Sequence, residues 1–88
     1  MPSEPPLEDD PEQLLLEVAR YPTDLLRRFR LGAALSRRQQ FAEAIPELQK
    51  ATCSPQVRLA AIRLLVEAFE AQGMFDLAAR LREQLSRE

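Results

Sequence analysis

The residues of this chain best suited to binding chemistry are its arginines, which make up eleven of its twelve basic residues. Guanidinium groups bind carboxylates and phosphates through paired hydrogen bonds. The arginines are equally well explained in two ways. They could bind an acidic partner, or they could be ordinary solvated residues of a helix surface, where an exposed ion pair contributes little to stability. Five of the arginines are concentrated in residues 27–38, at Arg27, Arg28, Arg30, Arg37 and Arg38.

The residue types that carry most enzymatic chemistry are missing or poorly placed. The chain has no histidine, which excludes Cys–His and Ser–His pairs and histidine metal ligands. It has no glycine-rich phosphate loop, and Cys53, without a base, is expected to be unreactive. The carboxylates of Glu43 and Glu47 share a helix face, as do those of Glu67 and Glu70. Without histidine partners they are expected to be solvated surface charges and not metal ligands. We therefore predict that the protein is not an enzyme and uses no metal or cofactor.

Composition indicates one small helical domain. Eighty-eight residues, of which 45% are hydrophobic, can bury a modest core. Two glycines and many Ala, Leu, Glu, Arg and Gln residues favour helices. The net charge of −2 is uneven, because residues 1–12 contribute −5 and the remainder contributes +3. Nucleic-acid binding is weakly supported, since it usually needs a dense basic stripe.

Apolar periodicity and helix start and stop signals predict five helices. Asp10 and Pro11 can begin the first helix, and Ser54 and Pro55 can begin the fourth. Gly73 can end the fourth helix in the left-handed conformation. The predicted ranges are about 11–20, 24–38, 41–52, 55–72 and 75–87.

Several positions within these helices carry their own expectations. Thr23 or Asp24 can cap the second helix. Pro46 lies inside the third helix and removes a backbone donor, so a slight bend or a late start is expected there. Leu59 and Phe75 belong to apolar faces and are expected to point inward.

Residues 1–9 form a separate region that is acidic and rich in proline. They offer little apolar area to offset the entropy of ordering, so we predict a disordered arm before a helical domain at 10–88. Because the body is basic, Glu8, Asp9 and Asp10 could fold back onto its arginines and compete with partners. The sequence has neither an apolar run of membrane-spanning length nor a leader pattern, and a cytoplasmic location is expected.

One pattern occurs twice, 34 residues apart, and this period is typical of helix-turn-helix repeats. Small residues in each copy would let two helices approach closely, and a phenylalanine would fill the groove beside each turn. The first copy contains Leu25, Leu31, Ala34, Phe41 and Ala44, and the second contains Leu59, Leu65, Ala68, Phe75 and Ala78.

This pattern resembles the tetratricopeptide repeat family. The family's signature positions are occupied in the first copy by Leu31-Gly32, Leu35, Ala44, Leu48, Ala51 and Pro55, and in the second by Leu65, Phe69, Gly73, Phe75 and Ala78. Arg28 stands where the family often has tryptophan, and Val66 and Arg82 replace the residues matching Gly32 and Leu48. The resemblance implies an all-α, right-handed stack of two helix pairs, at about 24–55 and 56–88, preceded by one extra helix. The replacements at Val66 and Arg82 predict either a slightly more open second pair or a shift of register in its last helix.

The resemblance also implies a concave groove lined by the first helix of each pair. Phe29 fits this groove, although a core position between helices is the stronger expectation for it. The family's Lys and Asn clamp for chaperone C-termini is not matched, so chaperone-tail binding is not predicted. The matching groove positions are Leu26, Phe29, Arg30, Ala33, Arg37, Ala60, Arg63, Leu64, Glu67 and Glu70.

We therefore expect a non-catalytic module that binds a peptide or helix of a partner protein, with an acidic segment as the best fit. A homo-oligomerising scaffold domain is one alternative, because either end of the stack could dock on another copy. An arginine-mediated nucleic-acid or anion binder is a weaker alternative, and a steep loss of affinity with salt would favour it.

Overall fold

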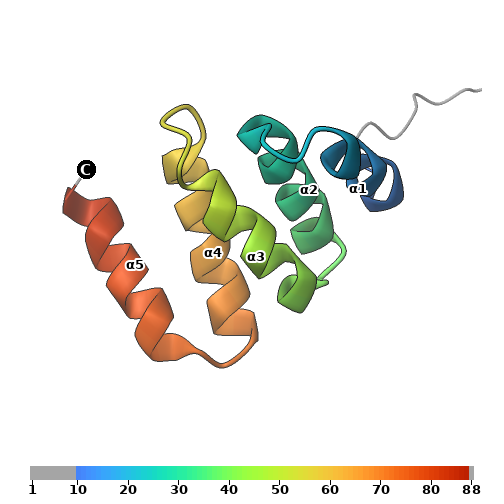
Figure 1. Ribbon diagram of the computed structural model, residues 1–88. Coiled ribbons are helices and arrows are strands. Elements are labelled where there is room, and N and C mark those ends of the chain that lie inside the picture. Colours follow the sequence, from blue (N-terminus) through green and yellow to red (C-terminus); the bar gives the residue numbers. More distant parts are fainter. Residues whose placement is uncertain (1–9, 88) are drawn as a thin grey trace, which may run out of the picture.

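The computed structural model describes residues 10–87 (Figure 1). Within this range the regular secondary structure consists of five helices and no strand, which confirms the predicted all-α class. No helix in it is long and apolar enough to cross a membrane. The predicted arm at 1–9 lies outside the described residues. The helices are α1 (Pro11–Arg20), α2 (Leu25–Arg37), α3 (Phe41–Ala51), α4 (Arg58–Ala71) and α5 (Phe75–Arg87).

The first two helices begin where their capping residues predict. The Asp10 carboxylate accepts a hydrogen bond from the backbone N–H of Glu12 at 3.1 Å, and Pro11 opens α1. The Asp24 carboxylate accepts one from the backbone N–H of Arg27 at 3.1 Å. Each bond satisfies a donor that the first helical turn would otherwise leave unpaired.

The predicted start of α4 is wrong by three residues. Residues 52–57 form successive turns, in which the N–H of Ser54 bonds to the carbonyl of Ala51 and the N–H of Val57 to that of Ser54. Val57 is buried in the core, and α4 begins only after it, without a side-chain cap. Docking of this valine therefore decides the boundary, rather than the capping signal of Ser54 and Pro55.

The α2–α3 and α4–α5 turns share one backbone design. Gln39 and Gly73, 34 residues apart, both have a positive φ, at 61° and 77°. The N–H of Gln40 bonds to the carbonyl of Leu35 at 2.9 Å, and that of Met74 to Phe69 at 2.7 Å. This pairing, with the left-handed residue before it, is a Schellman motif that ends each first helix.

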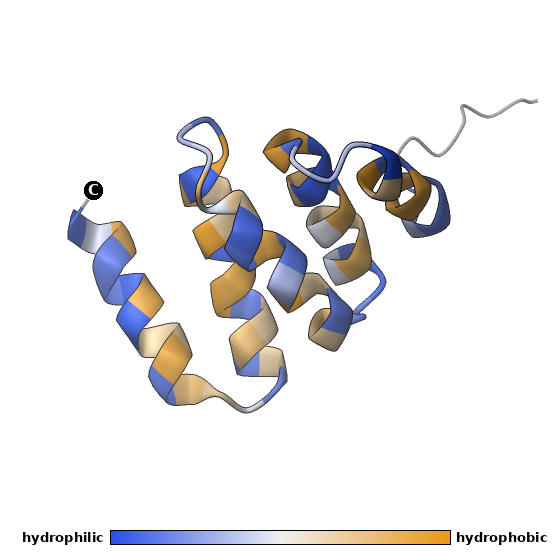
Figure 2. Cartoon of the chain, in the orientation of Figure 1, coloured by the Kyte–Doolittle hydropathy of each residue, from blue (hydrophilic) through white to orange (hydrophobic). Residues whose placement is uncertain are grey.

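Each helix packs on its neighbours in sequence, and α2 also packs on α4. By contrast, α3 does not pack directly on α1 or on α5. It packs on α2 and α4. Figure 2 shows α4, which meets three other helices, as predominantly apolar, while α5 alternates between polar and apolar residues. The largest fully buried side chains are Leu14, Leu31, Leu48 and Ile62.

The two hairpins differ at their point of closest approach. A Cβ at Gly32 would lie 2.7 Å from Leu48 Cγ, so glycine is needed for these helices to come together. In the second hairpin Val66 is buried and the position matching Leu48 is Arg82, an exposed side chain that pairs with Glu70. In the first hairpin the large apolar side chain at this contact belongs to the second helix, α3. In the second hairpin it belongs to the first helix, α4.

Several side chains depart from expectation. Phe75, expected inward, is 66% exposed, because α5 packs only on α4 and the side bearing Phe75 meets no other described helix. Leu59 is also exposed, since it lies in the first turn of the late-starting α4. Pro46 does not delay α3, which runs from Phe41 to Ala51.

Candidate functional site

The predicted groove residues gather along a hollow of about 520 Å³ between α2 and α4. Both helices contribute, so residues from the two halves of the sequence repeat face one continuous surface. The hollow is named the α2–α4 groove below. Its lining residues are Phe29, Ala33, Ser36, Arg37, Ala60, Arg63, Leu64 and Glu67.

Small residues let the two helices approach, and larger apolar ones form the groove walls. Ala33 and Ala60 are half-buried in its lining. Phe29 and Leu64 are also half-buried, and both pack against the core. Phe29 therefore meets both expectations for it, because one part of its ring faces the core while another lines the groove. Such walls are rigid, since they belong to the packed interior.

Charged groups stand at the rim of the groove. Arg37, Arg63 and Glu67 line it and are exposed. The rim thus joins two guanidinium groups to one carboxylate, which favours an acidic ligand over a basic one.

Three predicted positions do not line the groove. Leu26 is exposed nearer the start of α2, and Arg30 is half-buried on the same helix. Glu70 is drawn toward α5 by its ion pair with Arg82. These positions follow the helix period from groove residues, but the hollow is shorter than the helices that form it.

Ser36 is a lining residue that sequence reasoning missed. Its hydroxyl is buried and has no hydrogen-bond partner within residues 10–87. The signal for it was present, because Ser36 follows Phe29 and Ala33 at helical spacing. An unpaired buried hydroxyl costs free energy, and a ligand group could satisfy this one only after a side-chain rotation.

Other arginines of the 27–38 cluster hold helix junctions together. The Arg28 guanidinium donates hydrogen bonds of 2.9 Å to a Glu47 carboxylate oxygen on α3 and to the Pro22 carbonyl in the α1–α2 link. It thereby fills with polar contacts a position where the resembled family often has tryptophan. Arg38 lies 3.7 Å from the Asp10 carboxylate at the start of α1.

Arg27 combines several weak interactions. Its guanidinium lies 4.2 Å from the centre of the Tyr21 ring, within cation–π range, and 3.4 Å from the Glu17 carboxylate. It also pairs with Asp24. The pKa of Asp24 is lowered chiefly by the hydrogen bond from the Arg27 backbone N–H. Desolvation opposes this effect, and the hydrogen bond and positive charge of the Arg27 side chain lower the pKa further.

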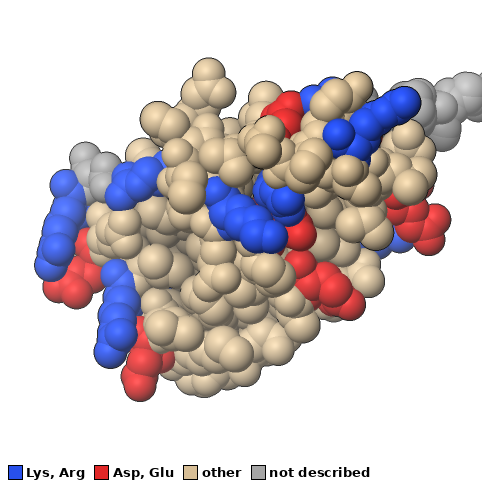
Figure 3. Space-filling model, in the orientation of Figure 1, with Lys and Arg blue, Asp and Glu red and all other residues tan. Residues whose placement is uncertain are grey.

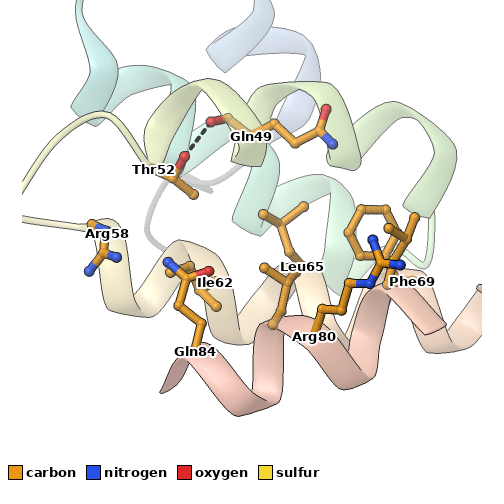
Figure 4. Close-up of a pocket in the computed structure, with 10 residues that line it drawn as sticks. Gln49, Thr52, Arg58, Ile62, Leu65, Phe69, Arg80 and Gln84 are labelled. Carbon is orange, nitrogen blue, oxygen red and sulfur yellow. Dashed lines mark hydrogen bonds between the residues drawn. The ribbon is translucent and has the colours of Figure 1, made fainter. Parts of the chain in front are cut away.

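Two further hollows lie on the opposite face, where α3 is separated from α1 and from α5. The α1–α3 hollow has a volume of about 580 Å³ and the α3–α5 hollow about 370 Å³. Leu31 and Leu35 of α2 line the first, and Leu65 and Phe69 of α4 line the second, 34 residues later. Figure 4 shows the α3–α5 hollow, with α4 side chains between those of α3 and α5.

Comparison of the chain with protein-family models, curated proteins and solved structures finds no match. Among residues 10–87, no group of three or more Cys, Asp and Glu side chains could hold a metal ion. Cys53 is exposed in the turn before α4. What the α2–α4 groove can bind is therefore inferred from its own residues.

Proposed function

We propose that this protein is a non-catalytic interaction module, in which α2–α3 and α4–α5 are tetratricopeptide-like repeats and the α2–α4 groove binds a segment of a partner protein. The observation that carries the proposal is that groove positions from both repeats line one hollow. The Schellman turns at Gln39 and Gly73, which match at the 34-residue period, support the repeat interpretation. A cytoplasmic location remains a prediction.

The groove favours a short acidic segment with one or two apolar anchors. An apolar side chain of the partner would rest on Phe29 and Leu64, while its carboxylates would meet Arg37 and Arg63. Because the groove walls belong to packed helices, little ordering cost falls on the protein when the ligand binds. The single carboxylate of Glu67 would orient the ligand by disfavouring an acidic group beside it.

The direct test is binding to an array of short acidic peptides that each contain one leucine. Arg37→Glu/Arg63→Glu should abolish binding of the peptides that the wild type selects, because both basic rim groups are reversed. Arg87→Glu is the matched control, since Arg87 is an exposed arginine on α5, in the opposite hairpin from Arg37.

Equal peptide selection by the wild type and the rim variant would contradict the groove. Binding that falls steeply with salt and ignores peptide sequence would favour the anion-binding alternative instead.

A further inference from the structure

The face that carries α1, α3 and α5 has features of a second binding surface. Its two hollows are related by the sequence repeat, because Leu15, Leu31 and Leu35 correspond to Gln49, Leu65 and Phe69 at a spacing of 34 residues. Figure 3 shows this face with a broad uncharged area between its basic and acidic groups. Large apolar side chains are exposed along it, including Leu15 at 57% and Leu77 at 42%.

The two hollows carry opposite charge. The α1–α3 hollow is lined by exposed Glu12 and Glu43, and its other charged groups, Arg38 and Glu47, have partners within the chain at 3.7 and 2.9 Å. In the α3–α5 hollow the charged lining residues are Arg58 and Arg80. The two hollows, which occupy corresponding places in the sequence repeat, therefore have complementary charge.

We propose that a second copy of this chain covers this face, with α5 of each copy lying in the α1–α3 hollow of the other. The two-fold axis lies in the interface, parallel to the helices. This rotation reverses the order of the helices across the interface and brings Arg80 of one copy between Glu12 and Glu43 of its partner. Contacts across a two-fold axis occur twice, so each complementary pair is duplicated.

Apolar contacts accompany the charges. Leu77 lies one turn before Arg80 on α5 and would rest against Leu15 and the floor of the partner's hollow, formed by Leu31 and Leu35. A helix lying between two others is ordinary ridge-into-groove packing. The molecule measures 44 × 25 × 20 Å, so this face is large enough for the roughly 800 Å² per partner of a standard interface.

Charge selects this arrangement over the other simple one. A two-fold axis running along the stack would place each hollow opposite its own copy, so that Glu12 and Glu43 would face carboxylates and Arg80 would face an arginine. Like charges placed opposite each other across an interface are strongly unfavourable. End-to-end stacking would leave both hollows open.

The test is a charge exchange followed by sedimentation equilibrium. The wild type should be a dimer at a concentration of about 100 μM, because an interface of this size commonly gives a dissociation constant in the micromolar range or below. Arg80→Glu and the double variant Glu12→Arg/Glu43→Arg should each weaken self-association by about ten-fold or more. An equimolar mixture of the two variants should form a heterodimer, since every contact across the interface is again complementary.

Arg82→Gln is the control, because Arg82 lies on the side of α5 away from Arg80 and pairs with Glu70 of α4. It should leave the dimer unchanged, and circular dichroism should show native helix content for all variants. If a charge variant loses helix content, Leu77→Gln offers a second disruption at an exposed position. The proposal is overturned if the wild type stays monomeric at about 100 μM, if the charge variants still dimerise, or if their mixture does not. None of these substitutions touches Arg37 or Arg63, so peptide binding in the α2–α4 groove is scored separately.

Discussion

At the scale of single residues, the contact between Gly32 and Leu48 sets how closely the first hairpin can pack. Leu48 is fully buried, so its side chain has little room to move away from an added methyl group. Glycine normally weakens a helix, and its presence in the middle of α2 is explained by this approach. The second hairpin, with Val66 and Arg82 at the matching positions, does not need it.

We expect Gly32→Ala to lower the free energy of unfolding by about 1–2 kcal/mol, because overpacking outweighs the gain in helix propensity. Urea denaturation followed by circular dichroism measures this change. Adding Leu48→Ala should cost less in the Gly32→Ala background than in the wild type, since it relieves the clash. Equal costs in the two backgrounds would show that the two side chains do not compete for space.

At the scale of helices, the turn after α2 contains an avoidable cost. Gln39 adopts a positive φ of 61°. Residues that carry a Cβ atom are strained in this left-handed conformation, whereas glycine is not. Gln39→Gly should raise the free energy of unfolding by about 0.5 kcal/mol, after the greater entropy of the unfolded glycine is subtracted. Gln40→Gly is the control, because Gln40 has a φ of −91° and should gain nothing. Denaturant midpoints measured side by side would show whether the strain is real.

The start of α2 should give the domain a dependence on pH. The folded pKa of Asp24 is lowered from 3.8, so its carboxylate stabilises the fold above that value. This contribution is lost as pH falls through the folded pKa. Asp24→Asn keeps an oxygen that can cap the helix but cannot titrate. The urea midpoints of wild type and variant should therefore converge between about pH 5 and about pH 2, and parallel curves would contradict the assignment.

Helix positions were largely predictable because their signals are local. The ends of α1 and α5, the cap at Asp24 and the left-handed Gly73 follow from residues within one or two turns. The positive φ of Gln39 was missed because glutamine carries no local signal for that conformation, which accompanies the hydrogen bonds from Gln39 and Gln40 that end α2. The start of α4 and the exposure of Phe75 depend on which helices meet, and a local pattern does not contain that information.

At the scale of the whole molecule, the groove was more predictable than the opposite face. The resemblance to tetratricopeptide repeats implies which residues of α2 and α4 line a groove, and seven of the ten positions predicted in this way line the hollow. The hollows beside α3 arise because α1, α3 and α5 do not touch, which is a matter of spacing between helices. Sequence periodicity gives the direction of side chains but not the distance between helices of different pairs.

The acidic residues 1–9 are joined to the helical domain at Asp10, the first residue that the structure describes. Arg38 holds Asp10 beside the end of α2, one residue after the rim arginine Arg37. Nine extended residues can reach about 30 Å, enough to cross the groove. Deleting residues 1–9 should therefore raise the affinity for an acidic peptide several-fold at low salt and little at high salt. Fluorescence anisotropy at two salt concentrations checks this, and equal affinities with and without the arm would dismiss competition.

The order of the helices has a consequence for how the domain forms. Apart from the contact of α2 with α4, every interface joins helices that follow each other directly along the chain. Folding therefore requires only short loops to close, and domains built this way reach the native state within microseconds to milliseconds. Such rapid folding leaves little time for molecules to aggregate through apolar surface that is exposed before the fold is complete.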